Sequence, residues 1–186
     1  MNTITSARPA SRYSTGAIVF HWLIAALIVF NFVAAWVAED MSKADAMKVM
    51  GNHKAIGITI LILSIGRILW RLTHRPPPFP VTMQPWEMLL ARITHGLFYF
   101  LMIGIPLAGW VFHSLYSGGA PVGFFGLFEY PGLPFAKDPA GGEVAGETHE
   151  ILATAMLFLA GLHVLGALKH RFVDKDRVMS RMLPGR

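Results

Sequence analysis

Four long stretches of the chain are apolar enough to cross a lipid bilayer. Residues 16–38 contain no charged side chain, and this run exceeds the roughly 20 residues that a helix needs to span hydrocarbon. A weaker run follows and ends at three consecutive prolines, Pro76 to Pro78, which cannot continue a helix. Residues 93–128 again carry no charge. The pattern predicts membrane-spanning helices at residues 14–38, 51–73, 86–116 and 148–171.

The connections between these helices are expected to lie outside the hydrocarbon. Residues 39–51 contain several charges and are predicted to form a linker. The stretch 117–121, Ser-Gly-Gly-Ala-Pro, ends the third helix. Residues 122–146 are rich in Gly, Pro and Phe, and we expect them to form an outer loop along the membrane interface. The predicted fold class is therefore an all-α membrane protein, a single domain over residues 1–186 built as an antiparallel four-helix bundle.

Composition agrees with a membrane protein and indicates its orientation. The chain is 54% hydrophobic and only 15% charged, with a mean hydropathy of +0.49, values that are unusual for a soluble domain. Its net charge of +5 comes from lysines and arginines that flank the apolar runs, so nucleic-acid binding is not expected. Most of them fall in the two tails and in the second connection, which predicts that both termini are cytoplasmic.

The chain contains no cysteine but has eight histidines. The absence of cysteine excludes disulfides, iron–sulfur clusters, thiolate metal sites and covalently attached c-type haem. A metal in this protein must therefore be held by nitrogen, oxygen or thioether ligands. Histidine is the obvious supply.

Two histidines of the last apolar run lie close to one face of the predicted helix. His149 and His163 are fourteen residues apart, which is ~40° short of four turns and ~21 Å along the axis. Histidine in hydrocarbon is costly and usually functional. Counting from the helix ends, His21 lies at the depth of His163, and His53 lies at the depth of His149. We call His21 and His163 the inner pair, and His53 and His149 the outer pair.

Two pairs of imidazoles facing each other inside a bundle suit two bis-histidine b-type haems. Two alternatives remain open at this point. Each histidine alone could be an ordinary hydrogen-bonded core residue. A zinc or copper site is also conceivable, although the inner layer has no carboxylate and the chain has no cysteine. Four histidines matched in depth favour the haems.

Gly57 and two arginines of the second helix could also contact a haem. Gly57 follows His53 by four residues on the same face, where a missing side chain lets a flat ring approach; ordinary helix packing is the alternative. Arg67 lies fourteen residues after His53, so Arg67 or Arg71 could pair with the propionates of the inner haem. The alternative is that both arginines extend toward lipid headgroups.

His95 of the third helix is predicted at the depth of the inner pair. It competes with His21 and His163 as an inner ligand. We favour a role near the haem or in handling a proton of a quinone, because imidazole titrates in the useful range.

The ordered set of histidine motifs resembles the bacterial cytochrome b561 family, especially its small stand-alone members of the superoxide oxidase type. The motifs are Phe20-His21-Trp22, Asn52-His53-Lys54 with Gly57, Thr148-His149-Glu150 and Gly161-Leu162-His163. The resemblance implies a multi-pass protein of the bacterial inner membrane that binds two non-covalent haems b. It also implies that His21, His53, His149 and His163 are the axial ligands of the haem irons, in the pairs given above.

The resemblance further implies an oxidoreductase that transfers electrons across the membrane, with ubiquinone as partner and superoxide as a plausible donor. One feature opposes superoxide, because the third connection carries five acidic residues against Lys137 and would repel an anion. Lys54, beside His53, could supply a local positive entrance. One alternative function is a cytochrome b anchor subunit that passes electrons between quinone and a separate soluble dehydrogenase or hydrogenase-type partner. A haem-free structural or transport bundle is a third class.

Overall fold

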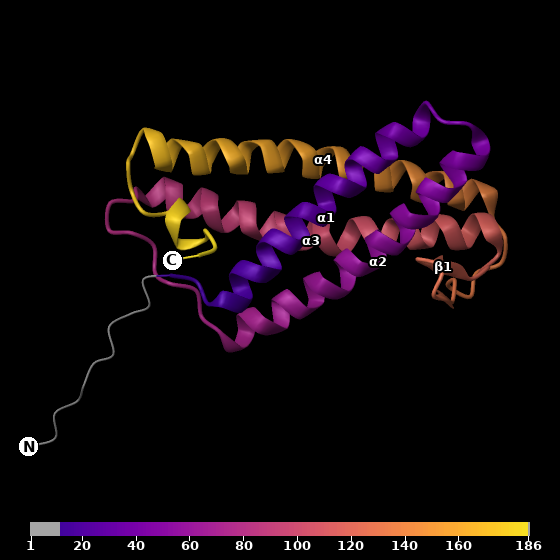
Figure 1. Ribbon diagram of the computed structural model, residues 1–186, viewed down its shortest axis with the longest axis horizontal. Helices are drawn as coiled ribbons and strands as arrows, with labels where there is room; N and C mark the ends of the chain where they lie inside the picture. Colours follow the sequence, from indigo (N-terminus) through magenta and orange to yellow (C-terminus); the bar gives the residue numbers. More distant parts are fainter. Residues whose placement is uncertain (1–11, 186) are drawn as a thin grey trace, which may run out of the picture.

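Four long helices account for most of the structure, a computed structural model that describes residues 12–185 (Figure 1). Each of the four is long and apolar enough to cross a membrane, which confirms the four long apolar helices predicted from the sequence. A two-stranded hairpin and a short 3₁₀ helix complete the fold. The elements are α1 (Thr15–Glu39), α2 (Lys43–Thr73), α3 (Pro85–Ser117), β1 (Val122–Phe124), β2 (Phe128–Tyr130), α4 (Pro139–Phe172) and η1 (Met179–Arg181).

Two helices begin well before their predicted starts. Helix α2 begins at Lys43 rather than at residue 51, because the Ser42 side chain accepts a hydrogen bond from the backbone of Asp45 and caps the helix. Helix α4 begins at Pro139 rather than at residue 148. Its cap is Asp138, whose side chain accepts from the backbone of Gly141. Both early turns are polar or glycine-rich, so apolar periodicity alone does not find them.

The predicted outer loop at residues 122–146 is therefore wrong in part. Its first portion forms an antiparallel hairpin, in which Val122 pairs with Tyr130 and Phe124 with Phe128. Its last portion is already the start of α4. Within residues 122–146, the irregular part is confined to the turn of the hairpin and to the residues between Tyr130 and Pro139.

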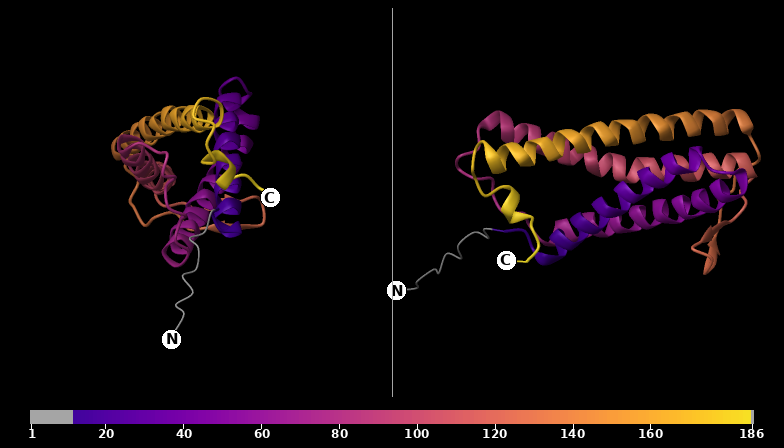
Figure 2. Two further views of the ribbon diagram at one scale, coloured as in Figure 1. Left: turned by 90° about the vertical axis from the view of Figure 1, so that its left-hand side faces the viewer. Right: turned by 45° about the horizontal axis from the view of Figure 1, so that its top comes forward.

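The helices pack in chain order around the bundle. Helix α1 packs on α2, α2 on α3, and α3 on α4 (Figure 2). Among residues 12–185, the backbone of α4 does not come close to that of α1 or α2, and α4 meets those helices only through side chains. One buried apolar cluster joins all four helices at mid-height; it consists of Ile24, Ile56, Ile60, Leu101, Met102 and Met156.

Most other large apolar side chains of the helices point outward. Val29, Phe30, Phe100 and Phe158 are examples, and each has more than half of its surface exposed. In water such a surface would cause aggregation. Its continuity around the bundle is what a protein surrounded by lipid requires.

The segment after α4 folds back across the end of the bundle where α1 begins. The indole Nε1 of Trp22 donates to the carbonyl of Met182 at 2.8 Å. Arg181 donates to the carbonyl of Pro78, in the connection between α2 and α3, at 2.6 Å. We call this the inner end of the bundle, and the opposite end, with the hairpin and the α1–α2 connection, the outer end (Figure 1).

Contact between α1 and α2 at the inner end depends on a glycine. A Cβ atom at Gly16 would collide with the indole ring of Trp70, whose Nε1 donates to Ser14 Oγ at 3.0 Å. Gly51 of α2 has no atom near the position of a Cβ. We expect Gly16→Ala to destabilise the fold by ~1–3 kcal/mol through overpacking, whereas Gly51→Ala gains up to ~1 kcal/mol of helix propensity.

Heat-induced unfolding of the two variants in the same detergent measures this difference. Gly16→Ala should lower the unfolding midpoint and Gly51→Ala should leave it unchanged or raise it. Equal shifts in the two variants would contradict the proposed packing.

Candidate functional site

The inner pair of histidines meets between α1 and α4. The ring centres of His21 and His163 are 6.2 Å apart, and the ring planes are inclined by 68°. Phe98 of α3 places its ring edge-on to His163, with centres 5.3 Å apart. The structure thus brings together the two residues that the sequence paired by depth.

The outer pair meets in the same way between α2 and α4. The ring centres of His53 and His149 are 6.1 Å apart, again with an inclination of 68°. Nδ1 of His53 lies 3.3 Å from the carbonyl oxygen of Asn31, and Nδ1 of His149 lies 2.8 Å from that of Ile105. When each Nδ1–H donates to its carbonyl, Nε2 is left with a free lone pair. Metal-ligating histidines usually have this second hydrogen bond.

The spacing of both pairs fits one metal ion between two imidazoles. An imidazole nitrogen binds a metal at about 2 Å and lies about 1 Å from its ring centre, so two rings on opposite sides of one ion are ~6 Å apart. The backbones leave room as well, since α4 does not pack directly on α1 or α2 in the described chain. Opposed imidazoles across a gap between helices are what a flat metal-centred group such as haem requires.

Gly57 lies on α2, one turn after His53. No atom lies within 4 Å of the position that a Cβ would occupy there. The alternative of ordinary helix packing therefore receives no support from the structure, because no neighbouring helix approaches this glycine. Contact with a haem stays a prediction.

His95 of α3 also lies close to His163. Their ring centres are 5.8 Å apart, and Nδ1 of His95 is 2.6 Å from the carbonyl oxygen of Ala91 on its own helix. Helices α3 and α4, which carry these two residues, pack directly together. The ring spacing alone does not distinguish His95 from His21. Because α3 packs directly on α4 whereas the backbone of α1 stays farther from it, we favour His21 as the partner of His163.

Arg67 and Arg71 extend toward the inner end of the bundle. Their guanidinium carbons lie 5.7 Å and 5.8 Å from the ring centre of Tyr99, at distances typical of cation–π contacts. Both arginines line a groove that also includes Tyr13 and Met182 and contains no carboxylate. Within residues 12–185 neither arginine forms an ion pair. Their charges can therefore serve an anionic group near the inner pair.

Burial in this groove raises the pKa of the Tyr13 phenol, against the opposing influence of Arg71 and Arg181. The phenol is therefore neutral at physiological pH. It can donate a hydrogen bond to an anion held by the arginines.

Two features beside the outer pair were missed by sequence reasoning. A Cβ at Gly109 of α3 would lie 3.0 Å from Nδ1 of His149, so this glycine lets the imidazole approach α3. Nζ of Lys54 lies 3.2 Å from Nδ1 of His113, and Nε2 of His113 lies 3.2 Å from the carbonyl oxygen of Ala120. Both contacts depend on how α3 is rotated against its neighbours. The sequence gives no signal for that rotation.

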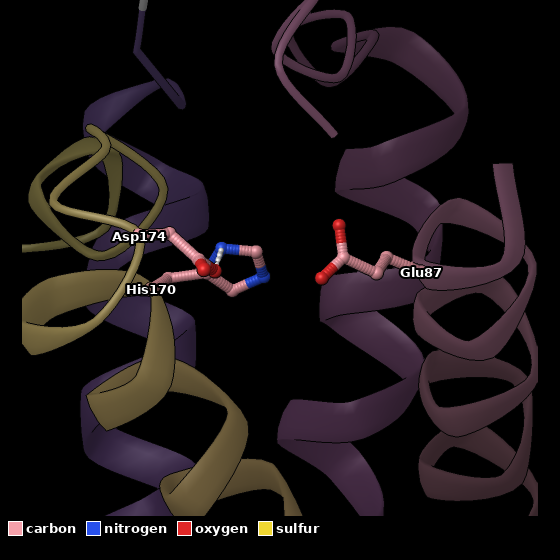
Figure 3. Close-up of side chains that lie close together, drawn as sticks. All are labelled: Glu87, His170 and Asp174. Atoms are coloured by element: carbon pink, nitrogen blue, oxygen red, sulfur yellow. Dashed lines mark ion pairs between the residues drawn. The ribbon is translucent and has the colours of Figure 1, made fainter. Parts of the chain in front are cut away.

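A cluster of ionic side chains joins α3 to the end of α4 at the inner end (Figure 3). Glu87 faces His170 and Asp174 across the gap between the two helices. Nζ of Lys169 lies 2.6 Å from Glu87 and 2.7 Å from Asp174, and Nδ1 of His170 lies 2.8 Å from Asp176. Because an ammonium group already bridges the carboxylates, we interpret the cluster as a clamp for the C-terminal segment and not as a metal site.

Comparison with known proteins covers almost the whole chain. A family model described as prokaryotic cytochrome b561 matches residues 12–185. The chain is 34% identical to cytochrome b561 homolog 2 of Escherichia coli K12 over 175 residues, which are 92% of this chain and 91% of that protein. It is 33% identical to the probable superoxide oxidase CybB of Yersinia pestis over 182 residues, 93% and 96% of the two chains. Cytochrome b562 of Cereibacter sphaeroides is 28% identical over 177 residues, 92% and 94% of the two chains.

These matches confirm the resemblance drawn from the histidine motifs. They agree with the four membrane-length helices and with imidazole pairs of a spacing suited to haem iron. The protein is a multi-pass bacterial membrane protein of electron transport, and its family implies b-type haem. The chain belongs to the prokaryotic cytochrome b561 family.

Proposed function

We propose that this protein is a dihaem cytochrome that transfers electrons across the bacterial inner membrane, from superoxide to ubiquinone. One observation carries the proposal. Two imidazole pairs, with ring centres 6.2 Å and 6.1 Å apart, share α4 with fourteen residues between them. Two such sites ~21 Å apart along a helix reach from one half of a membrane to the other.

His21 and His163 would hold one haem, and His53 and His149 the other. Bound haem would supply a one-electron iron couple at each site. The carbonyls of Asn31 and Ile105 keep the outer imidazoles in the tautomer that offers Nε2. Between the two layers, the buried apolar cluster keeps water out of the path.

Arg67 and Arg71 are suited to the propionates of the inner haem. Their guanidinium groups stack near Tyr99 and face no carboxylate in the groove. Paired propionates would satisfy both charges at the inner end. His95, whose ring centre is 5.8 Å from that of His163, would exchange a proton with a quinone reduced at this end.

The proposed topology has four antiparallel spans with both termini in the cytoplasm. Arg67, Arg71 and the basic C-terminal segment then lie on the cytoplasmic side, as the positive-inside rule expects. The outer pair faces the periplasm, where Lys54 offers a positive charge beside His53. In the balanced reaction two superoxide ions each lose one electron to become O2, and one quinone takes up two electrons and two protons to become quinol.

Haem content of alanine variants tests the ligand assignment. We expect His21→Ala and His53→Ala each to retain about half of the haem of the unmodified protein, and the double variant to retain none. His95→Ala, the matched control, should keep both haems. Haem and protein are quantified in the same purified sample by the pyridine haemochrome assay and amino-acid analysis. If His95→Ala loses as much haem as His21→Ala, His95 is the inner ligand.

A larger side chain at Gly57 tests whether a haem lies against this residue. No protein atom is near, so Gly57→Leu should fold normally and yet lose about half of the haem. The control is Gly96→Leu, since Gly96 also has open space around it but is exposed on the outside of α3. Unfolding midpoint and haem content are measured together. Full haem content in Gly57→Leu would exclude a haem at this glycine.

Reduction of ubiquinone by superoxide tests the donor. The purified protein in liposomes should form quinol when superoxide is generated outside, without any second chain. Lys54→Gln should slow the reaction about two- to tenfold at low salt, because it removes a charge that attracts the anion. Lys48→Gln is the control, since Lys48 already pairs with Asp45 at 3.2 Å on an exposed face. No quinol from a haem-replete protein, together with a co-purifying second chain, would favour the anchor-subunit alternative.

A further inference from the structure

The turn of the hairpin has a conformation that its sequence does not favour. The backbone N–H of Leu127 donates to the carbonyl of Phe124 at 3.0 Å, and the two residues between them, Phe125 and Gly126, have φ of 50° and 73°. Positive φ at both central positions marks a mirror-image turn, in which Asn-Gly is the preferred sequence. A bulky residue such as Phe125 is an outlier at positive φ. Its side chain must therefore be useful enough at this position to outweigh the strain.

The tip of the hairpin is apolar and exposed. Phe125, Leu127 and Phe128 expose 45%, 79% and 57% of their surfaces. The ring of Phe124 lies 4.8 Å from those of both Phe125 and Phe128, measured between ring centres. Residues 93–128 carry no charged side chain, so Glu129 is the first charged residue of the hairpin. In water this cluster would be a costly surface.

The base of the hairpin, in contrast, is firmly attached to the bundle. Val122 is buried against α2, and the ring of Tyr130 lies edge-on to Trp110 with centres 5.9 Å apart. The indole of Trp110 donates to the carbonyl of Pro131 at 3.2 Å, and the backbone of Leu133 donates to Ser114 Oγ at 2.9 Å. The tip is thus held in a fixed direction by its base.

That direction is sideways from the outer end of the bundle. The right-hand view of Figure 2 shows the hairpin beside the outer ends of the helices, projecting away from their axes. Its base lies at the level of Trp110, and tryptophans typically mark the boundary between lipid and water. Burial raises the pKa of Tyr130 to about 12, so its phenol is uncharged at this boundary.

We propose that the hairpin tip, Phe125 to Phe128, inserts into the lipid leaflet at the outer end and anchors that end at a fixed depth. The helices expose large apolar side chains to the lipid. An aromatic hairpin tip beside them enters the headgroup–acyl boundary as interfacial segments do. The anchor is connected to the outer pair through Ala120, His113 and Lys54, each in hydrogen-bond contact with the next. Lys54 directly follows His53.

Lipid insertion can be measured cleanly because the chain has no cysteine. Leu127→Cys in the full haem-loaded protein is labelled with a nitroxide and reconstituted in phospholipid liposomes. Its collision rates with oxygen, which concentrates in lipid, and with a water-soluble nickel chelate are measured by power saturation. A label at Glu143→Cys, on the exposed first turns of α4 at the same end, is the control. We expect Leu127 to favour oxygen several-fold relative to Glu143.

A second variant separates insertion from folding. Phe125→Asn supplies the residue that the turn prefers, so the hairpin should persist, and the label at Leu127 should shift toward the nickel chelate. Equal chelate access at Leu127 and Glu143 in the unmodified tip would overturn the proposal. So would dipolar broadening between labels that disappears on dilution with unlabelled protein, which would indicate contact between two copies. Neither result depends on the electron donor.

Discussion

The arrangement of this protein depends on the cost of placing histidine in hydrocarbon. An imidazole there needs a partner for each ring nitrogen, and backbone carbonyls can satisfy only the Nδ1–H groups of the outer pair. That leaves Nε2 of His53 and of His149 free to bind a metal ion, and the two ring centres lie 6.1 Å apart. The iron of the proposed haem would take up both lone pairs and so offset part of the cost of burying the imidazoles.

Helix α4 has a special position because it supplies one ligand to each pair. Among the four long helices of the described chain, only α3 packs its backbone closely against it, while His163 and His149 meet histidines of α1 and α2. Short contacts on the α3 side are possible because Gly109 and Gly104 have no side chains to obstruct them. The position of α4 in the bundle is thus set by its packing on α3 and by the haems that its histidines would share with α1 and α2. Gly109, which lets His149 approach α3, therefore also affects how His149 meets His53 of α2.

Much of the fold and the inner and outer histidine pairs could be predicted from the sequence. The same physical reasons explain which features could not. Apolar runs indicate burial in lipid, and they therefore predict the four helices. The rise per residue of a helix converts residue number into depth, and depth pairs His21 with His163. The polar first turns of α2 and α4 carry no such signal, although Asp138-Pro139 is a usual start of a helix. The hairpin was missed because Phe125 occupies a position where turn rules expect Asn. Contacts that depend on helix rotation, such as Lys54 with His113, could not be derived from depth.

The distribution of charge gives the two layers different environments. Near the inner pair, Arg67 and Arg71 face no carboxylate in their groove. In the outer pair, Lys54 directly follows His53 and Glu150 directly follows His149. Nearby positive charge favours the reduced form of a metal centre, because the added electron lowers the local repulsion. An iron site between His21 and His163 would therefore have a higher reduction potential than one between His53 and His149, other factors being equal. In the proposed function, electrons that enter at the outer end would then be drawn toward the inner end, where the groove and His95 lie.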